Sequence, residues 1–149
     1  MKKFTIIIKI FFVYMILILG VSAKESNYFK KGIEYFQKKE FDKSKILFER
    51  DIVFNPKSEK SYLYLAKIFN NNNNDQEEEV NLNSVLLLNP QNDEAIYMLT
   101  LLKIKQFDYS YAKELLDQFI LVCESFCSKK EEIKKKFEKI NLENEKNNN

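Results

Sequence analysis

Phe54-Asn55-Pro56 and Leu88-Asn89-Pro90 are two copies of one short pattern, an apolar residue followed by Asn and Pro. The spacing between the two prolines also relates residues of similar size elsewhere in the chain. Three such ladders are formed by Tyr28, Tyr62 and Ile96, by the small residues Gly32, Ala66 and Thr100, and by the large residues Phe48, Leu82 and Leu116. A period of about 34 residues, which all these spacings share, is that of a helix–turn–helix repeat.

The ladder residues suit the packing of two antiparallel helices. Helices in a hairpin lie about 8–10 Å apart, and small residues such as Gly32 are needed where they approach most closely. Pro56 and Pro90 end the second helix of their repeats, because the residue before a proline is driven out of the α region. The run from Asn70 to Asn74 fills a turn, since Asn tolerates positive φ. We therefore predict helices over 26–38, 42–54, 59–69, 76–88, 93–105, 109–122 and 129–142.

With these features the chain resembles the tetratricopeptide-repeat (TPR) family, whose repeats are pairs of antiparallel helices. The resemblance rests on Tyr28, Gly32, Ser44, Phe48 and Pro56 in the first repeat, on Tyr62, Ala66, Leu82 and Pro90 in the second, and on Ile96, Thr100, Ala112 and Leu116 in the third. It implies an all-α fold, a right-handed α-solenoid of three TPR repeats at 25–58, 59–92 and 93–126. A C-terminal capping helix over 127–142 should cover the open end of the stack, followed by a disordered tail over 143–149.

Three positions depart from the family pattern. Asp51 stands where Ala is usual, and Glu124 stands one repeat period after Pro90, where a closing Pro is expected. Glu78 occupies a position that calls for a small residue. Either its stem covers the core while its carboxylate reaches water, or the second hairpin is looser than the others.

Residues 1–23 have the pattern of a signal peptide. Lys2 and Lys3 form a basic start, and an apolar run follows that is broken once by Lys9 and is uninterrupted from Ile10 to Leu19. Val21-Ser22-Ala23 then offers small or aliphatic side chains to a signal peptidase. We predict cleavage after Ala23 and export to the periplasm or the secretory route. The alternative is an uncleaved membrane anchor over residues 4–21, because these residues nearly reach the ~20 that span a bilayer.

The composition of the 149 residues excludes several kinds of site. The chain has no His, which rules out His-based triads and His-rich metal sites, and its two glycines are too few and too far apart for a phosphate-binding loop. Without residues 1–23 the formal charge is 21 basic minus 22 acidic residues, or −1, and the charges alternate in sign along the chain. A nucleic-acid surface needs a one-sided basic stripe. We expect no nucleic acid, metal, cofactor or small-molecule substrate.

Cys123 and Cys127 are the two cysteines of the chain, and they flank the join between the third hairpin and the last predicted helix. Two cysteines tend to pair in an oxidising compartment, and a break between helices makes the geometry possible. We predict a local structural disulfide that fixes the capping helix. Two free buried thiols and a redox-active pair are the alternatives.

In the TPR family the first helices of the repeats line a concave surface. The residues that would face it here are Phe29, Ile33, Phe36, Lys60, Leu63, Lys67, Tyr97, Leu101 and Ile104. The resemblance implies a groove for an apolar peptide or an amphipathic helix. Alternatively, these side chains pack between repeats. The family's carboxylate clamp is not matched, because Phe29 and Ile33 stand where the clamp needs Lys and Asn.

The sequence therefore predicts a protein-interaction module in an exported compartment, an adaptor, scaffold or assembly factor rather than an enzyme. Its partner would be a protein or peptide, with membrane contact through the N-terminal segment if that segment is uncleaved. A second hypothesis is a thiol-redox or disulfide-linked helper that uses Cys123 and Cys127. A third is a small hydrolase that uses paired carboxylates such as Asp75 and Glu79.

Overall fold

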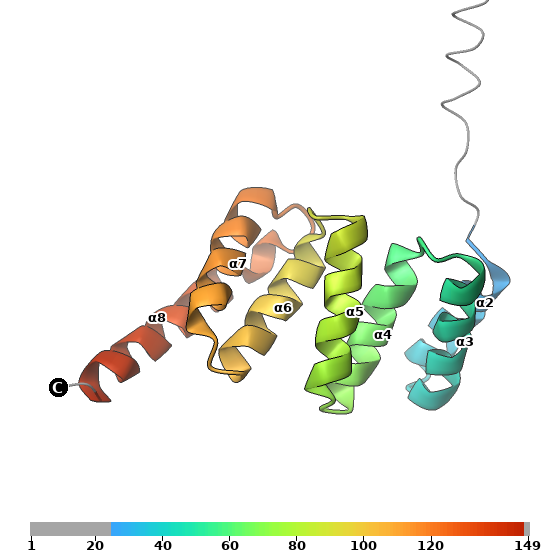
Figure 1. Ribbon diagram of the computed structural model, residues 1–149, viewed down its shortest axis with the longest axis horizontal. Helices are drawn as coiled ribbons and strands as arrows, with labels where there is room; N and C mark the ends of the chain where they lie inside the picture. Colours follow the sequence, from blue (N-terminus) through green and yellow to red (C-terminus); the bar gives the residue numbers. More distant parts are fainter. Residues whose placement is uncertain (1–24, 148–149) are drawn as a thin grey trace, which may run out of the picture.

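The computed structural model describes residues 25–147, and this part of the chain is built from α-helices without strands (Figure 1). The helices are α2 (Asn27–Gln37), α3 (Phe41–Phe54), α4 (Glu59–Asn71), α5 (Asp75–Leu88), α6 (Asp93–Lys105), α7 (Tyr109–Val122) and α8 (Lys130–Asn147), with a short 3₁₀ helix η1 (Cys127–Lys129) before α8. The all-α prediction is confirmed. Apart from the end of α8, the helix bounds lie close to the predicted ones.

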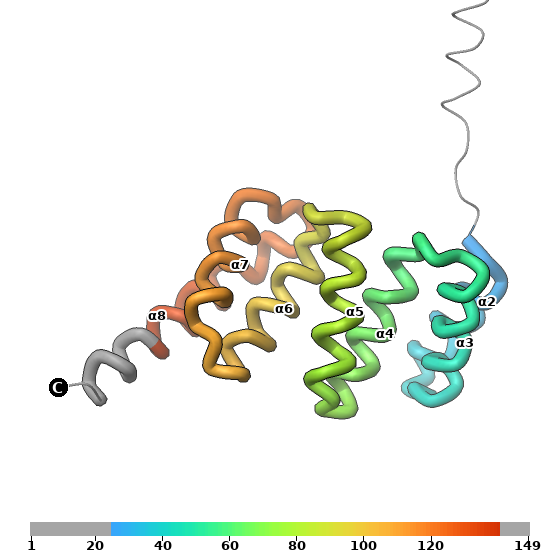
Figure 2. Tube along the Cα trace, in the orientation of Figure 1, coloured from blue at the N-terminus to red at the C-terminus, as the bar shows by residue number. Residues whose placement is uncertain are grey.

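The helices form three hairpins, α2–α3, α4–α5 and α6–α7, which stand side by side in one row with α8 at the end (Figure 2). Each helix packs on its neighbours in the sequence, as expected for a solenoid. The second helices α3, α5 and α7 each have 14 residues. They begin one repeat period apart, at positions 41, 75 and 109.

The turn inside each hairpin has the same backbone conformation. Lys39, Asn73 and Phe107 have positive φ angles of 60°, 53° and 62°, and they too are spaced by one repeat period. Asn73 belongs to the Asn run and is the residue type that suits this left-handed conformation. Lys39 and Phe107 adopt the same conformation at a cost of about 1–2 kcal/mol each.

The small and large ladders meet inside the hairpins as predicted. Gly32 on α2 lies directly against Phe48 on α3, and the Ser44 hydroxyl donates a hydrogen bond to the Gly32 carbonyl oxygen over 2.8 Å. The corresponding ladder residues of the other two hairpins are also buried. Asp51, the first departure from the pattern, is buried where it accepts a hydrogen bond from the Ser58 hydroxyl at 2.5 Å. Its carboxylate thereby ties the end of α3 to the start of α4.

The last helix covers the open end of the stack and extends further than predicted. Ile133 and Phe137 on α8 are buried in the core that α6 and α7 share. The helix runs to Asn147, so residues 143–147, expected in a disordered tail, are helical. No Pro or Gly follows Leu142 to stop the helix, and Glu and Lys are good helix formers.

The predicted signal peptide, residues 1–23, lies outside the described residues. Among the helices that the structure describes, none has the length and apolar character needed to cross a membrane.

Candidate partner-binding groove

A pocket of about 440 Å³ opens on the face that α2, α4 and α6 share. Its lining comes from α2 (Phe36), α4 (Lys67, Asn70, Asn71), α5 (Glu78), α6 (Glu94, Tyr97, Met98, Leu101) and the segment after α7 (Phe126). We call the apolar lining side chains from α6 (Tyr97, Met98, Leu101) the pocket floor and the polar lining side chains from α4 and α5 (Lys67, Asn70, Asn71, Glu78) the pocket wall. The three helices that were expected to line a groove, α2, α4 and α6, all contribute to this lining.

The nine predicted groove residues divide into two sets. Phe36, Lys67, Tyr97 and Leu101 line the pocket. Phe29, Leu63 and Ile104 are buried in the core, Ile33 packs partly buried against the Phe29 cluster, and Lys60 is exposed and paired with Glu25 at 2.7 Å. The prediction that the five residues of this second set line the groove is therefore corrected. These side chains follow the same helices but point into helix–helix contacts or lie outside the pocket.

An ion pair crosses the pocket between two repeats. Lys67 on α4 lies 2.8 Å from Glu94 on α6, and both side chains are about three-quarters buried. The Lys67 ammonium also lies 4.7 Å from the centre of the Tyr64 ring, at a distance suited to a cation–π contact. These contacts fix the position of the positive charge that the pocket contains.

Glu78 is the buried carboxylate of the pocket wall. It is 1% exposed, and Asn70 Nδ2 donates to both of its carboxylate oxygens at 3.0 Å. Burial raises the pKa of Glu78 above its usual 4.5, while the hydrogen bond from Asn70 opposes the change. The expectation that the Glu78 carboxylate reaches water is therefore wrong. The carboxylate is buried and accepts hydrogen bonds from the Asn70 amide on α4 instead.

Phe126 also lines the pocket and was not predicted from the sequence. Its ring centre lies 5.7 Å from that of Tyr97. The segment is held by Asp93, whose Oδ2 accepts hydrogen bonds from the backbone N–H groups of Glu124 at 2.8 Å and Phe126 at 2.7 Å. Burial opposes ionisation of Asp93, but these bonds and those from Ser125 outweigh it and hold its pKa below the usual 3.8. No repeat ladder reaches this segment, so only the structure places it.

Among known proteins, similarity to this chain was found in solved structures. No family model matches the chain, and no curated protein matches it. The first TPR domain of Spaghetti (RPAP3), solved with an HSP90 peptide, is 14% identical with a TM-score of 0.63, over 72% of this chain and 88% of that one. The Sgt2 TPR domain from Aspergillus fumigatus is 18% identical with a TM-score of 0.64, over 77% and 80%. The Arabidopsis OM64 TPR domain is 15% identical with a TM-score of 0.62, over 72% and 92%.

This chain has the tetratricopeptide-repeat fold. The resemblance inferred from the repeat ladders is thereby supported by structures that share few residues with it. At these low sequence identities the structural similarity shows the fold and assigns no role to the pocket residues.

The two cysteines join the TPR hairpins to α8. Cys123 and Cys127 form a disulfide with their Cα atoms 5.1 Å apart, across the break between α7 and α8. The closed loop contains Ser125 and Phe126, so the disulfide and Asp93 constrain the same segment. The bond thus lies beside the pocket and helps to position Phe126.

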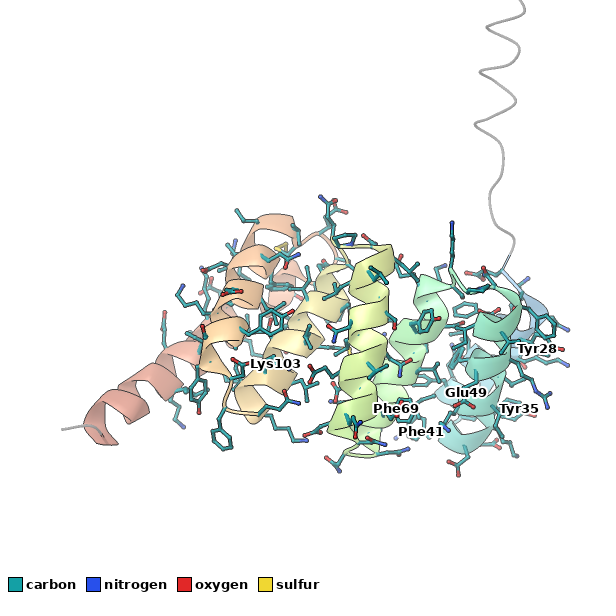
Figure 3. All side chains as sticks on the ribbon, viewed as in Figure 1. Tyr28, Tyr35, Phe41, Glu49, Phe69 and Lys103 are labelled. Carbon is teal, nitrogen blue, oxygen red and sulfur yellow. A yellow bond between two sulfur atoms is a disulfide. The ribbon has the colours of Figure 1, made fainter. Side chains whose placement is uncertain are left out.

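The predicted hydrolase pair does not form a catalytic arrangement. Asp75 is paired with Lys105 at 2.6 Å, and Glu79 is paired with Lys103 at 2.6 Å. The hydrogen bond from Lys103, which Figure 3 labels on α6, lowers the pKa of Glu79. Both carboxylates therefore join α5 to α6. Within residues 25–140, no group of His, Cys, Asp or Glu side chains could hold a metal ion.

The ends of α3, α5 and α7 carry an apolar ladder that was not predicted from the sequence. Val53, Leu87 and Leu121 are 73%, 84% and 85% exposed, and they occupy the same position of the repeat near the ends of α3, α5 and α7. These ends lie along one edge of the row, at the top of Figure 1. We call these three residues the outer ladder, and they offer a second face against which binding to the pocket can be tested.

Proposed function

We propose that this chain is a non-enzymatic interaction module that binds a polypeptide segment in the groove formed by α2, α4 and α6. The observation that carries the proposal is the pocket of about 440 Å³ to which helices of all three repeats contribute. A pocket with an apolar floor and a few fixed polar groups is suited to anchoring one or two side chains of a partner.

Two further observations support the proposal. The TPR domain of RPAP3, which has the same fold, was solved with a peptide bound. The pocket residues Phe36 and Met98 remain partly exposed, so the groove offers apolar surface to a partner in addition to the ion pair of Lys67. The module is proposed to act after export, because residues 1–23 have a signal-peptide pattern and the Cys123–Cys127 disulfide suits an oxidising compartment.

Site-specific photocrosslinking in the cells that produce the protein tests the proposal. The photoreactive amino acid p-benzoylphenylalanine would replace Phe36 in the pocket, and, as a matched control, Phe107, which is 77% exposed in the turn before α7. A third probe would replace Leu87 on the outer ladder. All three substitutions place a larger aromatic side chain at an exposed or partly exposed position and should leave the fold intact, as circular dichroism can check.

We expect the Phe36 probe to form one discrete product in which a short segment of another polypeptide is attached. The Phe107 and Leu87 probes should give none. A discrete product from the Leu87 probe alone would place binding on the outer ladder and overturn the groove proposal. The absence of any product from the Phe36 probe, in cells where the chain is folded and exported, would also contradict it.

A further inference from the structure

Glu78 is an acidic side chain whose charge is not balanced inside the described part of the chain. Its carboxylate lies in the pocket wall, is 1% exposed, and forms no ion pair with any residue from 25 to 140. Its hydrogen-bond partner is one amide group, Asn70 Nδ2, which is shared by both oxygens. A carboxylate offers about four acceptor positions, and a buried ionised carboxylate is costly unless it is paired.

The cations around Glu78 are already paired with other carboxylates. Lys67 binds Glu94 at 2.8 Å, and Lys105 binds Asp75 at 2.6 Å. Each of these pairs is neutral as a unit, so the pocket retains the negative charge of Glu78 as its excess charge. A ligand that brings one positive charge would complement the pocket.

The rest of the pocket suits the stem of a long basic side chain. Met98 and Leu101 are partly exposed and line the pocket floor beside Tyr97. Lysine and arginine place their methylene groups along apolar surface of this kind while the charged head reaches a polar partner. Asn70, which covers the Glu78 carboxylate, is itself exposed, so its amide can turn aside for a stronger donor.

We propose that this pocket binds a Lys or Arg side chain of the partner segment, with the stem along Met98 and Leu101 and the charged head at Glu78. This inference rests on the proposed groove function and names the chemistry of its partner. The partner is a segment in which a basic residue stands among apolar ones.

A series of three fluorescent peptides tests this preference directly. Each has the sequence acetyl-Leu-X-Leu-amide with a dye on a C-terminal linker, where X is arginine, citrulline or glutamate. Citrulline has nearly the shape of arginine without its charge. Binding to the full chain would be measured by fluorescence anisotropy at pH 7 and at low ionic strength, since partly exposed charge pairs are screened by salt.

We expect the arginine peptide to bind at least about tenfold more tightly than the citrulline and glutamate peptides. Glu78→Gln, which keeps the shape of the side chain, should abolish the difference between arginine and citrulline. Glu77→Gln removes the same charge one residue away, at an exposed position outside the pocket, and should leave the difference unchanged. Thermal denaturation of both variants establishes that they are folded.

The preference should also weaken as the pH falls and Glu78 takes up a proton. The other titratable groups around Glu78 are Asp75 on its own helix, Lys105 on α6, and the Lys67–Glu94 pair across the pocket. Repeating the peptide titration at each pH with Glu78→Gln measures the contribution of these other groups, because the variant retains Asp75, Lys105, Lys67 and Glu94.

Equal binding of the arginine and citrulline peptides, or an arginine preference that survives in Glu78→Gln, would overturn the inference. Tighter binding of the glutamate peptide would assign the site to Lys67 instead. Photocrosslinking through Phe36 does not depend on charge. A discrete Phe36 product without an arginine preference would therefore leave the groove function standing while this inference fails.

Discussion

Gly32 and Phe48 show how closely the residues of one hairpin are matched to each other. A Cβ atom added at Gly32 would lie 2.6 Å from Phe48 Cε1, and the Phe48 ring is fully buried. The corresponding positions hold Ala66 and Leu82 in the second hairpin, and Thr100 and Leu116 in the third. The smallest first-helix residue of the three, Gly32, thus faces the largest second-helix residue, Phe48.

Gly32→Ala should therefore destabilise the protein. Overpacking a buried contact lowers the free energy of unfolding by about 1–3 kcal/mol, and this should exceed the gain of about 1 kcal/mol from the better helix propensity of Ala. The double variant Gly32→Ala/Phe48→Leu recreates the pair found in the second hairpin. The decrease in the free energy of unfolding of this double variant, measured by urea denaturation, should be smaller than the sum of the decreases for Gly32→Ala and Phe48→Leu. Strict additivity would show that the two side chains do not compete for the same space.

Glu78 should lower stability at neutral pH. Because burial raises its pKa above 4.5, the folded chain holds this proton more tightly than the unfolded chain does, and its contribution to stability is lost as the pH rises through the raised value. We expect Glu78→Gln to increase the free energy of unfolding at pH 7, and the gain to shrink below about pH 4.5. Chemical denaturation at both pH values is the measurement, with Glu77→Gln as the control. An equal gain at both pH values would argue against a buried ionised carboxylate.

At the scale of elements, the helices could be predicted from the sequence because the repeat makes each position occur three times. Pro56 and Pro90 mark helix ends, and the ladders at 32, 66 and 100 mark helix contacts, so one register fixes all three hairpins. The left-handed turn residues were predictable only at the Asn run. Lys39 and Phe107 have no side-chain feature that favours positive φ, and the hairpin geometry imposes this conformation on them.

The turn before α7 should be stabilised by glycine. Phe107 has a φ of 62° and is 77% exposed, so its side chain contributes little packing while its Cβ disfavours the backbone conformation. We expect Phe107→Gly to be more stable than Phe107→Ala by about 1 kcal/mol in thermal or chemical denaturation. Both variants lose the Phe107 ring, so the difference between their free energies of unfolding reports the cost of the backbone conformation. Equal stability of the alanine and glycine variants would contradict a left-handed conformation at this position.

The segment between α7 and α8 should depend more on Asp93 than on its disulfide. Asp93 accepts two backbone hydrogen bonds and a side-chain bond there, whereas Cys123 and Cys127 close a very short loop. We expect Asp93→Asn to reduce the free energy of unfolding by about 1–3 kcal/mol at pH 7. The double variant Cys123→Ser/Cys127→Ser should lose less, at the low end of the ~0–5 kcal/mol range.

The pH dependence of Asp93→Asn provides a check. Because the pKa of Asp93 is lowered in the folded chain, its contribution is complete above the unfolded value near 3.8 and is lost as the pH falls through the folded value. The difference between wild type and Asp93→Asn should therefore narrow in acid. A difference that is constant with pH would mean that the carboxylate charge has no part in holding the segment.

At the scale of the whole molecule, the sequence predicted the helices that face the groove, but only four of the nine side chains expected to reach it line the pocket. A first helix of a repeat contacts its own partner helix and the neighbouring repeats, so adjacent residues on one stripe end in different surroundings. Leu63 is buried while Lys67, one turn later, lines the pocket. Phe126 lies beyond the last repeat helix and is placed by contacts that no periodicity predicts.

The hydrophobic core is divided in two along the stack. One cluster joins the first hairpin to α4 through Leu65 and Ile68, and the larger cluster extends from α4 to α8. Stability in a solenoid is approximately the sum of repeat and interface terms, so a unit attached at one interface can open without the rest. We therefore expect the amide protons of α2 and α3 to exchange through a partial opening that leaves α6 and α7 folded.

Native-state hydrogen exchange of two matched variants would measure this division. Leu65→Ala removes a contact of the smaller cluster and should lower the opening free energy of α2 and α3 by about 2–5 kcal/mol, with little change in α6 and α7. Ile133→Ala, which removes a contact that α8 makes in the larger cluster, should show the reverse pattern. The two clusters share α4, so its amides should respond to both variants. A uniform change over all helices in either variant would mean that the stack opens as one cooperative unit, in which case the division of the core has no energetic counterpart.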